Sequence, residues 1–180
     1  MIFIIDDKVS RQDDYGWSLE RFSKFANITA INNLQSLEEK KTDFFSSDNN
    51  IILFHESFLN SSDYEVQQKL EAFKSELREH EGKTLIAYFS GSKNSRWIDS
   101  DGKVCMMPPD ILYYNLSLFA NKCQNSEFNF RYLLFGENME IESRLKQDLD
   151  EVNNKNWTKD KSFMHLPKTM PATVFLIMPM

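Results

Sequence analysis

The chain begins with Met1-Ile2-Phe3-Ile4-Ile5-Asp6-Asp7-Lys8, in which four apolar side chains run directly into two adjacent carboxylates. An unbroken, largely β-branched run of this kind is typical of a strand buried on both faces. Such strands lie in the middle of parallel sheets, between two layers of helices. In open α/β sheets, ligands bind beyond the carboxyl ends of the strands. Asp6 and Asp7 therefore lie where a functional crevice is expected.

The next part of the chain alternates between strand and helix patterns. Short apolar runs predict three further strands, at 28–31, 51–54 and 84–89. Apolar residues at helical spacing predict the connecting helices, at 17–26, 34–45 and 66–77, with a polar connector before the first of them. This alternation implies right-handed crossovers and a parallel, doubly wound sheet.

The regular alternation ends after residue 90. Residues 96–107 are predicted to form a strand, a turn and a strand, because Asp101-Gly102 is a strong hairpin-turn signal. Pro108-Pro109 then opens a helix predicted from 111 to about 122. We therefore expect a hairpin where a further helix would continue the pattern.

The rest of the chain has its own predicted elements: a strand at 130–135, a helix at 141–152 and an apolar strand at 173–178. The expected fold is α/β, with a mainly parallel sheet in residues 1–122 and an α/β extension in residues 123–180. The extension is either a separate unit or a continuation of the same domain.

Composition narrows the class of protein. Hydrophobic residues make up 41% and charged residues 27%, which is ordinary for a globular protein. The net charge of −6 argues against an extended nucleic-acid footprint, since such binding requires an excess of Lys and Arg. No apolar run is long enough to cross a bilayer, and no signal-peptide pattern is present. Cys105 and Cys123 fit buried free thiols, so we expect a cytoplasmic protein.

Reactive side chains follow three of the predicted strands: Asp6 and Asp7, His55 and Glu56, and Ser90. In this order and chemistry, residues 1 to about 122 resemble the receiver domain of bacterial response regulators, which has a flavodoxin-like sheet. In that family an acidic pair after the first strand holds Mg²⁺, and an Asp after the third strand accepts a phosphoryl group. A hydroxyl residue after the fourth strand and a Lys after the fifth contact the phosphoryl oxygens.

The resemblance is incomplete at two positions. Asp6 and Asp7 match the acidic pair, and Ser90 matches the hydroxyl, but the acceptor position falls on His55 or Glu56 and the lysine position on Met107. Without the lysine, a phosphoryl group loses one compensating cation. The predicted hairpin also takes the place of the family's fourth helix. The resemblance thus implies a degenerate receiver, not phosphorylated on Asp, that serves as a non-enzymatic regulatory or protein-interaction module in bacterial signalling, without a cofactor.

Other interpretations stay open for the same residues. One is a metal-dependent phosphoryl-transfer or phosphodiester-cleaving enzyme, in which Asp6, Asp7 and Glu56 hold Mg²⁺ and His55 is the general base. Another is a solvated strand-end turn beside a hydrogen-bonded structural histidine. A third makes the chain one subunit of a larger assembly whose activity lies in another chain.

The segment after the first predicted strand carries Arg11, Tyr15 and Trp17, residue types that are common at binding hot spots. We predict that these side chains form the surface for a protein partner beside the acidic crevice. The alternative is that Tyr15 and Trp17 pack on the sheet. Similarly, Trp97 and residues 106–109 form either a second apolar surface or ordinary core.

Overall fold

The computed structural model describes residues 1–47, 49–91, 96–126, 129–136, 138, 141 and 144–149. The chain divides into two compact units, Met1–Met139 and Glu140–Met180. The sheet and the candidate site described below belong to the first unit.

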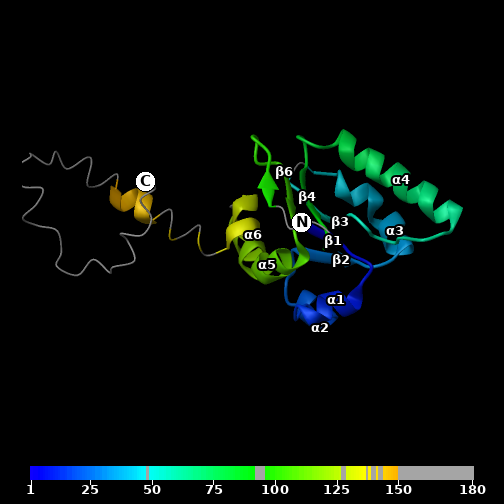
Figure 1. Ribbon diagram of the computed structural model, residues 1–180, viewed down its shortest axis with the longest axis horizontal. Helices are drawn as coiled ribbons and strands as arrows, with labels where there is room; N and C mark the ends of the chain where they lie inside the picture. The colour runs from blue at the N-terminus through cyan, green and yellow to red at the C-terminus, as the bar shows by residue number, and fades with distance from the viewer. Residues whose placement is uncertain are drawn as a thin grey trace, which may run out of the picture. The chain divides into compact units, whose positions relative to one another are not determined.

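Within the described residues, six strands form one sheet in the order β2-β1-β3-β4-β6-β5 (Figure 1). The strands are β1 (Ile2–Ile5), β2 (Ile28–Ile31), β3 (Ile51–His55), β4 (Leu85–Phe89), β5 (Trp97–Ile98) and β6 (Val104–Met107). β5 pairs antiparallel with β6, and the other pairs are parallel. The predicted α/β class with a mainly parallel sheet is confirmed, and so is the predicted hairpin.

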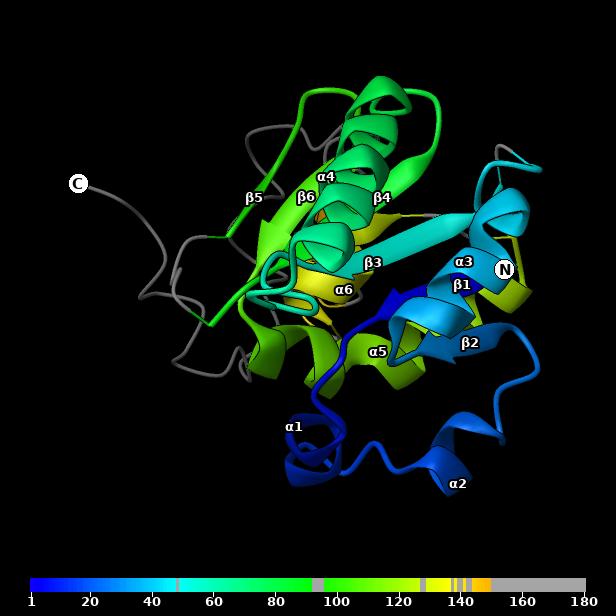
Figure 2. The same ribbon diagram turned by 90° about the vertical axis from the view of Figure 1, so that its right-hand side faces the viewer.

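Helices cover both faces of the sheet (Figure 2). They are α1 (Val9–Asp14), α2 (Leu19–Phe22), α3 (Leu34–Phe44), α4 (Tyr64–Glu79), α5 (Pro109–Gln124) and α6 (Phe130–Phe135). Side chains of α2, α5 and α6 pack on one face, and side chains of α3 and α4 pack on the other. None of the helices in the described part of the chain is long and apolar enough to cross a membrane.

The central strand β1 contributes to both cores. Ile2 and Ile4 belong to the cluster that contains α5 and α6, whereas Phe3 and Ile5 belong to the cluster that contains α3 and α4. All four side chains are buried. Since successive side chains of a strand point to opposite faces, this explains why the run is apolar without alternation. The first polar residue of the chain is Asp6, which directly follows the strand.

The predicted strand at 130–135 is wrong, because these residues form α6. Asn129 caps the helix with a side-chain oxygen that accepts a backbone N–H of the first turn. The buried side chains Phe130, Leu133 and Leu134 lie three and four residues apart, which is helical spacing. A short aromatic and apolar run fits either element, and packing against α5 selects the helix.

The predicted helix at 17–26 is also wrong in extent. Residues 9–14, which were expected to belong to a polar connector, form α1. Within the predicted range 17–26, only Leu19–Phe22 is helical, as α2. Gly16 has a φ of +74°, which separates the two helices, and the side chain of Ser18 caps the second.

The first unit extends beyond the predicted boundary at residue 122 because α6 packs on α5. The amide of Asn115 donates to the carbonyl oxygen of Leu133 at 2.9 Å. The rings of Phe119 and Phe130 stack with centroids 6.0 Å apart. α6 is thus part of the same core as the sheet.

In the second unit, residues 141 and 144–149 are helical, as predicted for 141–152. Their apolar side chains are exposed: Ile141, Leu145 and Leu149. The predicted strand at 173–178 lies outside the described residues.

Gly136 provides a test of the α5–α6 packing. Its φ is +56°, and a Cβ added there would lie 2.3 Å from Oδ1 of Asn115. We expect Gly136→Ala to lower the free energy of unfolding by about 1–3 kcal/mol in chemical denaturation. Gly82→Ala is the matched control, because Gly82 has a φ of +81° but no atom within 4 Å of the added Cβ. Equal losses in the two variants would argue against the contact with Asn115.

Candidate functional site

Three of the predicted crevice residues lie together at the carboxyl edge of the sheet. Asp6 and Asp7 follow β1, and His55 ends the neighbouring strand β3. One ligand atom from each residue lies within 4.8 Å of the others. Asp6 is fully buried, His55 is 2% exposed and Asp7 is partly exposed. The parallel pairing of β1 with β3 places these side chains at one edge.

The carboxylate of Asp6 is bound by groups of the chain itself. Arg11, from α1, donates from Nε to Oδ2 at 3.2 Å and from Nη2 to Oδ1. The hydroxyl of Tyr113, from α5, donates to Oδ2 at 2.8 Å, and the backbone N–H of Lys8 donates to Oδ1 at 3.1 Å. A buried carboxylate is tolerated only when its charge is paired and hydrogen-bonded, and these donors meet that condition.

Tyr113 connects the segment after β1 to α5. Burial, together with the charge of Asp6, raises the pKa of Tyr113, so its hydroxyl stays protonated and can donate. The ring of Tyr15 stacks on that of Tyr113 with centroids 5.6 Å apart, and Nε1 of Trp17 donates to its carbonyl oxygen at 2.7 Å. Tyr15 and Trp17 therefore contact Tyr113 itself, and Arg11 contacts the carboxylate of Asp6 to which Tyr113 is hydrogen-bonded.

His55 is held in one tautomer by the backbone. Its Nδ1 accepts the N–H of Ser57 at 3.2 Å, so the neutral ring carries its proton on Nε2. Burial, and then the positive charge of Arg11, lowers the pKa of His55, so the ring is neutral at pH 7. Nε2 of His55 and Oδ1 of Asp7 are buried and lack hydrogen-bond partners in the described structure. The crevice therefore keeps two unsatisfied polar atoms.

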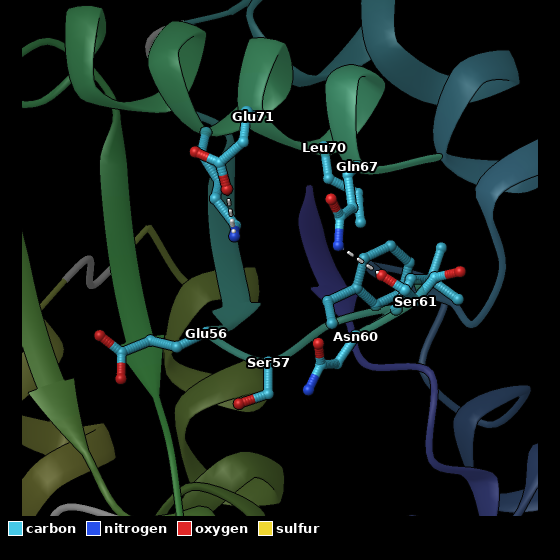
Figure 3. Close-up of a pocket in the computed structure, with 10 residues that line it drawn as sticks. Glu56, Ser57, Asn60, Ser61, Gln67, Leu70 and Glu71 are labelled. Carbon is cyan, nitrogen blue, oxygen red and sulfur yellow. Dashed lines mark hydrogen bonds and ion pairs between the residues drawn. The ribbon is translucent and has the colours of Figure 1, made fainter. Parts of the chain in front are cut away.

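The other two predicted crevice residues are Glu56, which follows β3, and Ser90, which follows β4. The metal-capable group found in the described residues does not contain Glu56. Glu56 instead lines a pocket of about 430 Å³ between the β3–α4 loop and α4, where Gln67 and Glu71 overhang the loop (Figure 3). Ser90 is buried after β4, and its N–H donates to the carbonyl oxygen of Met107 at 3.2 Å. Glu56 therefore lies outside the metal-capable group of Asp6, Asp7 and His55.

The predicted partner surface needs correction at Trp17. This side chain is 1% exposed and belongs to the core against α5 and α6, so it does not form an external contact. The side chain of Arg11 is 19% exposed and forms an ion pair with Asp6. Tyr15 is 41% exposed and remains available on one side of its ring. Burial of the indole is favourable here because its N–H has a backbone acceptor.

The sequence interpretation missed the roles of Gln12 and Tyr113. The amide of Gln12 donates to the main-chain oxygen of Asp6 at 3.1 Å, and Tyr113 donates to the carboxylate. One signal was available for Tyr113, because it lies three residues before Leu116 on the predicted apolar side of its helix. A tyrosine at such a position needs a polar partner when it is buried.

Comparison with known proteins adds no assignment, because no family model, curated protein or solved structure matches the chain.

Proposed function

We propose that the chain is a degenerate receiver-like module that regulates or binds a protein partner in a bacterial signalling system and is not phosphorylated on Asp. Among the described residues, five parallel strands follow the order β2-β1-β3-β4-β6, which supports this proposal because it is the order of flavodoxin-like sheets. The acidic pair at the end of β1 supports it as well.

The observation that carries the proposal is the internal neutralisation of Asp6. Both of its oxygens are bound by Arg11, and Tyr113 and Lys8 supply the remaining donors. In this state the charge of Asp6 is compensated by groups of the chain itself. This arrangement therefore suits a protein with one fixed state better than one that gains and loses a phosphoryl group.

The residues at neighbouring strand ends support the same proposal. Phosphoryl transfer needs an acceptor and cations that compensate the transferred charge. The end of β3 offers the neutral ring of His55, whose Nδ1 is already used, and the end of β6 offers the buried thioether of Met107. Neither strand end supplies an Asp acceptor or a second cation, and Glu56, which follows His55, is one methylene longer than Asp and lines a separate pocket.

Incubation with acetyl phosphate, followed by intact-mass spectrometry, tests this function. We expect no phosphoryl adduct with or without Mg²⁺, since the acceptor and lysine positions carry other residues. The unfolded chain serves as the control for nonspecific labelling. A single adduct on the folded protein that disappears in His55→Ala or Glu56→Gln would contradict the proposal.

One observation favours a second candidate, a metal-dependent phosphodiester-cleaving enzyme. Oδ1 of Asp7 and Nε2 of His55 are buried without partners, as expected of ligands or of a base that awaits a substrate. Cleavage of a generic aryl phosphodiester in the presence of Mn²⁺, lost in Asp7→Asn, would favour this candidate. The proton on Nε2 counts against it, because a general base needs a ring nitrogen that is free to accept a proton.

A further inference from the structure

We propose that Arg11 is a tethered cation that occupies the place of a divalent metal ion on Asp6, and that its removal turns the crevice into a metal site. The metal would be a first-row divalent ion such as Mn²⁺ or Zn²⁺. This inference rests on the proposed function, because it explains how the module dispenses with a metal.

The crevice contains the ligands for one such ion. Asp6, Asp7 and His55 each place a ligand atom within 4.8 Å of the other two. Bonds from Zn²⁺ to nitrogen or carboxylate oxygen are about 2.0–2.2 Å long, so a small adjustment lets the three atoms share one ion. A set of two carboxylates and one imidazole favours Mn²⁺ or Zn²⁺ over Mg²⁺, which prefers an all-oxygen shell.

Arg11 blocks this set in the intact protein. A carboxylate has about four acceptor positions, two on each oxygen. On Asp6, Oδ1 accepts from Arg11 and Lys8, while Oδ2 accepts from Arg11 and Tyr113. All four positions are filled, two of them by the guanidinium, so an ion can bind Asp6 only by displacing at least one of these donors. Displacement would also bring two like charges into one buried site.

The remaining ligands provide a second, independent observation. His55 is almost fully buried, and its Nε2 has no hydrogen-bond partner in the described structure; the same holds for Oδ1 of Asp7. Such buried polar atoms are costly unless something binds them. Metal binding through Nε2 moves the ring proton and gives up the bond from the N–H of Ser57. This cost weakens metal binding by His55 and Asp7 alone, so the ion needs Asp6 as a third ligand.

The experiment compares Mn²⁺ binding and thermal midpoints in the full chain and its variants. In Arg11→Ala, loss of the cation leaves Asp6 buried and unpaired, so we expect a lower midpoint that Mn²⁺ raises again. We expect the unchanged protein and Arg11→Lys, which keeps the positive charge, to be insensitive to millimolar Mn²⁺. Arg78→Ala is the matched control, because its side chain is 62% exposed and is paired only loosely, at 3.9 Å, with Glu71. It should also be insensitive.

Adding Asp7→Asn to Arg11→Ala locates the ion. We expect this second change to weaken Mn²⁺ binding by at least about tenfold, because it removes a charged ligand. If Arg11→Ala does not fold without metal, Arg11→Gln takes its place, since an amide retains one donor for Asp6. The expected results are the same.

Two outcomes would overturn the inference. One is Mn²⁺ binding by the unchanged protein as tight as that by the Arg11 variant. The other is a folded Arg11 variant whose midpoint and calorimetric titration do not respond to Mn²⁺. A phosphoryl adduct on the unchanged protein would instead overturn the proposed function and leave the role of Arg11 intact, so the two failures are distinguishable.

Discussion

Asp6→Ala is expected to lower the free energy of unfolding by about 3–5 kcal/mol, the loss typical of breaking a buried ion pair from one side. The substitution leaves the guanidinium of Arg11 and the hydroxyl of Tyr113 without their shared acceptor. It also removes one of the contacts that join the segment around β1 and α1 to α5. Urea denaturation of the two proteins at neutral pH gives the difference directly.

Asp13→Ala is the control for Asp6→Ala, because Asp13 is an exposed residue of α1. Its effect should stay within about 0.5 kcal/mol. The double variant Asp6→Ala/Arg11→Ala should lose less than the sum of the two single variants, because neither then leaves an unpaired charge. A loss below about 1 kcal/mol for Asp6→Ala would show that this carboxylate does not organise the crevice.

Leu53→Ala is expected to lower the free energy of unfolding by about 2–5 kcal/mol, and Ile4→Ala by a similar amount. Leu53 lies in β3 opposite Ile4 of β1 and Ala87 of β4, and all three side chains are buried in the same cluster. The truncation leaves a cavity in the middle of the sheet, where neighbouring strands cannot move in to fill it. Thermal and chemical denaturation measure the loss.

Tyr114→Ala is the control for Leu53→Ala. It also truncates a large side chain, but this one is 86% exposed on α5, so its effect should be small. Comparable losses at the two positions would be incompatible with β3 as a central strand.

The strands and longer helices could be predicted because their patterns are local. The unbroken run of Ile and Phe in β1 indicates burial on both faces of the strand, and the regular spacing of apolar residues in α4 indicates burial on one face of the helix. The placement of Asp6 and His55 at one edge follows from these local patterns plus the rule that successive parallel strands share their carboxyl edge. No long-range contact had to be known for these predictions.

The failures occur where a short segment fits two patterns. Residues 130–135 satisfy both strand and helix composition, and their contact with α5 decides between them. The same holds for Trp17, whose type suits either a binding surface or a core. Its N–H finds an acceptor on Tyr113, and that contact makes burial favourable.

The sequence alone determined the fold class, the central strands and the edge at which Asp6, Asp7 and His55 gather. Only the tertiary structure decided that the charge of Asp6 is compensated by other groups of the chain. Tyr113 lies 107 residues away in sequence, and its hydroxyl reaches Asp6 only because of the rotation and position of α5 on the sheet. Periodicity fixes which face of a helix is buried, but it does not fix which polar atoms meet across the buried interface. The pairing of charges in the crevice is therefore a property of packing, and the chemistry of the site depends on that pairing.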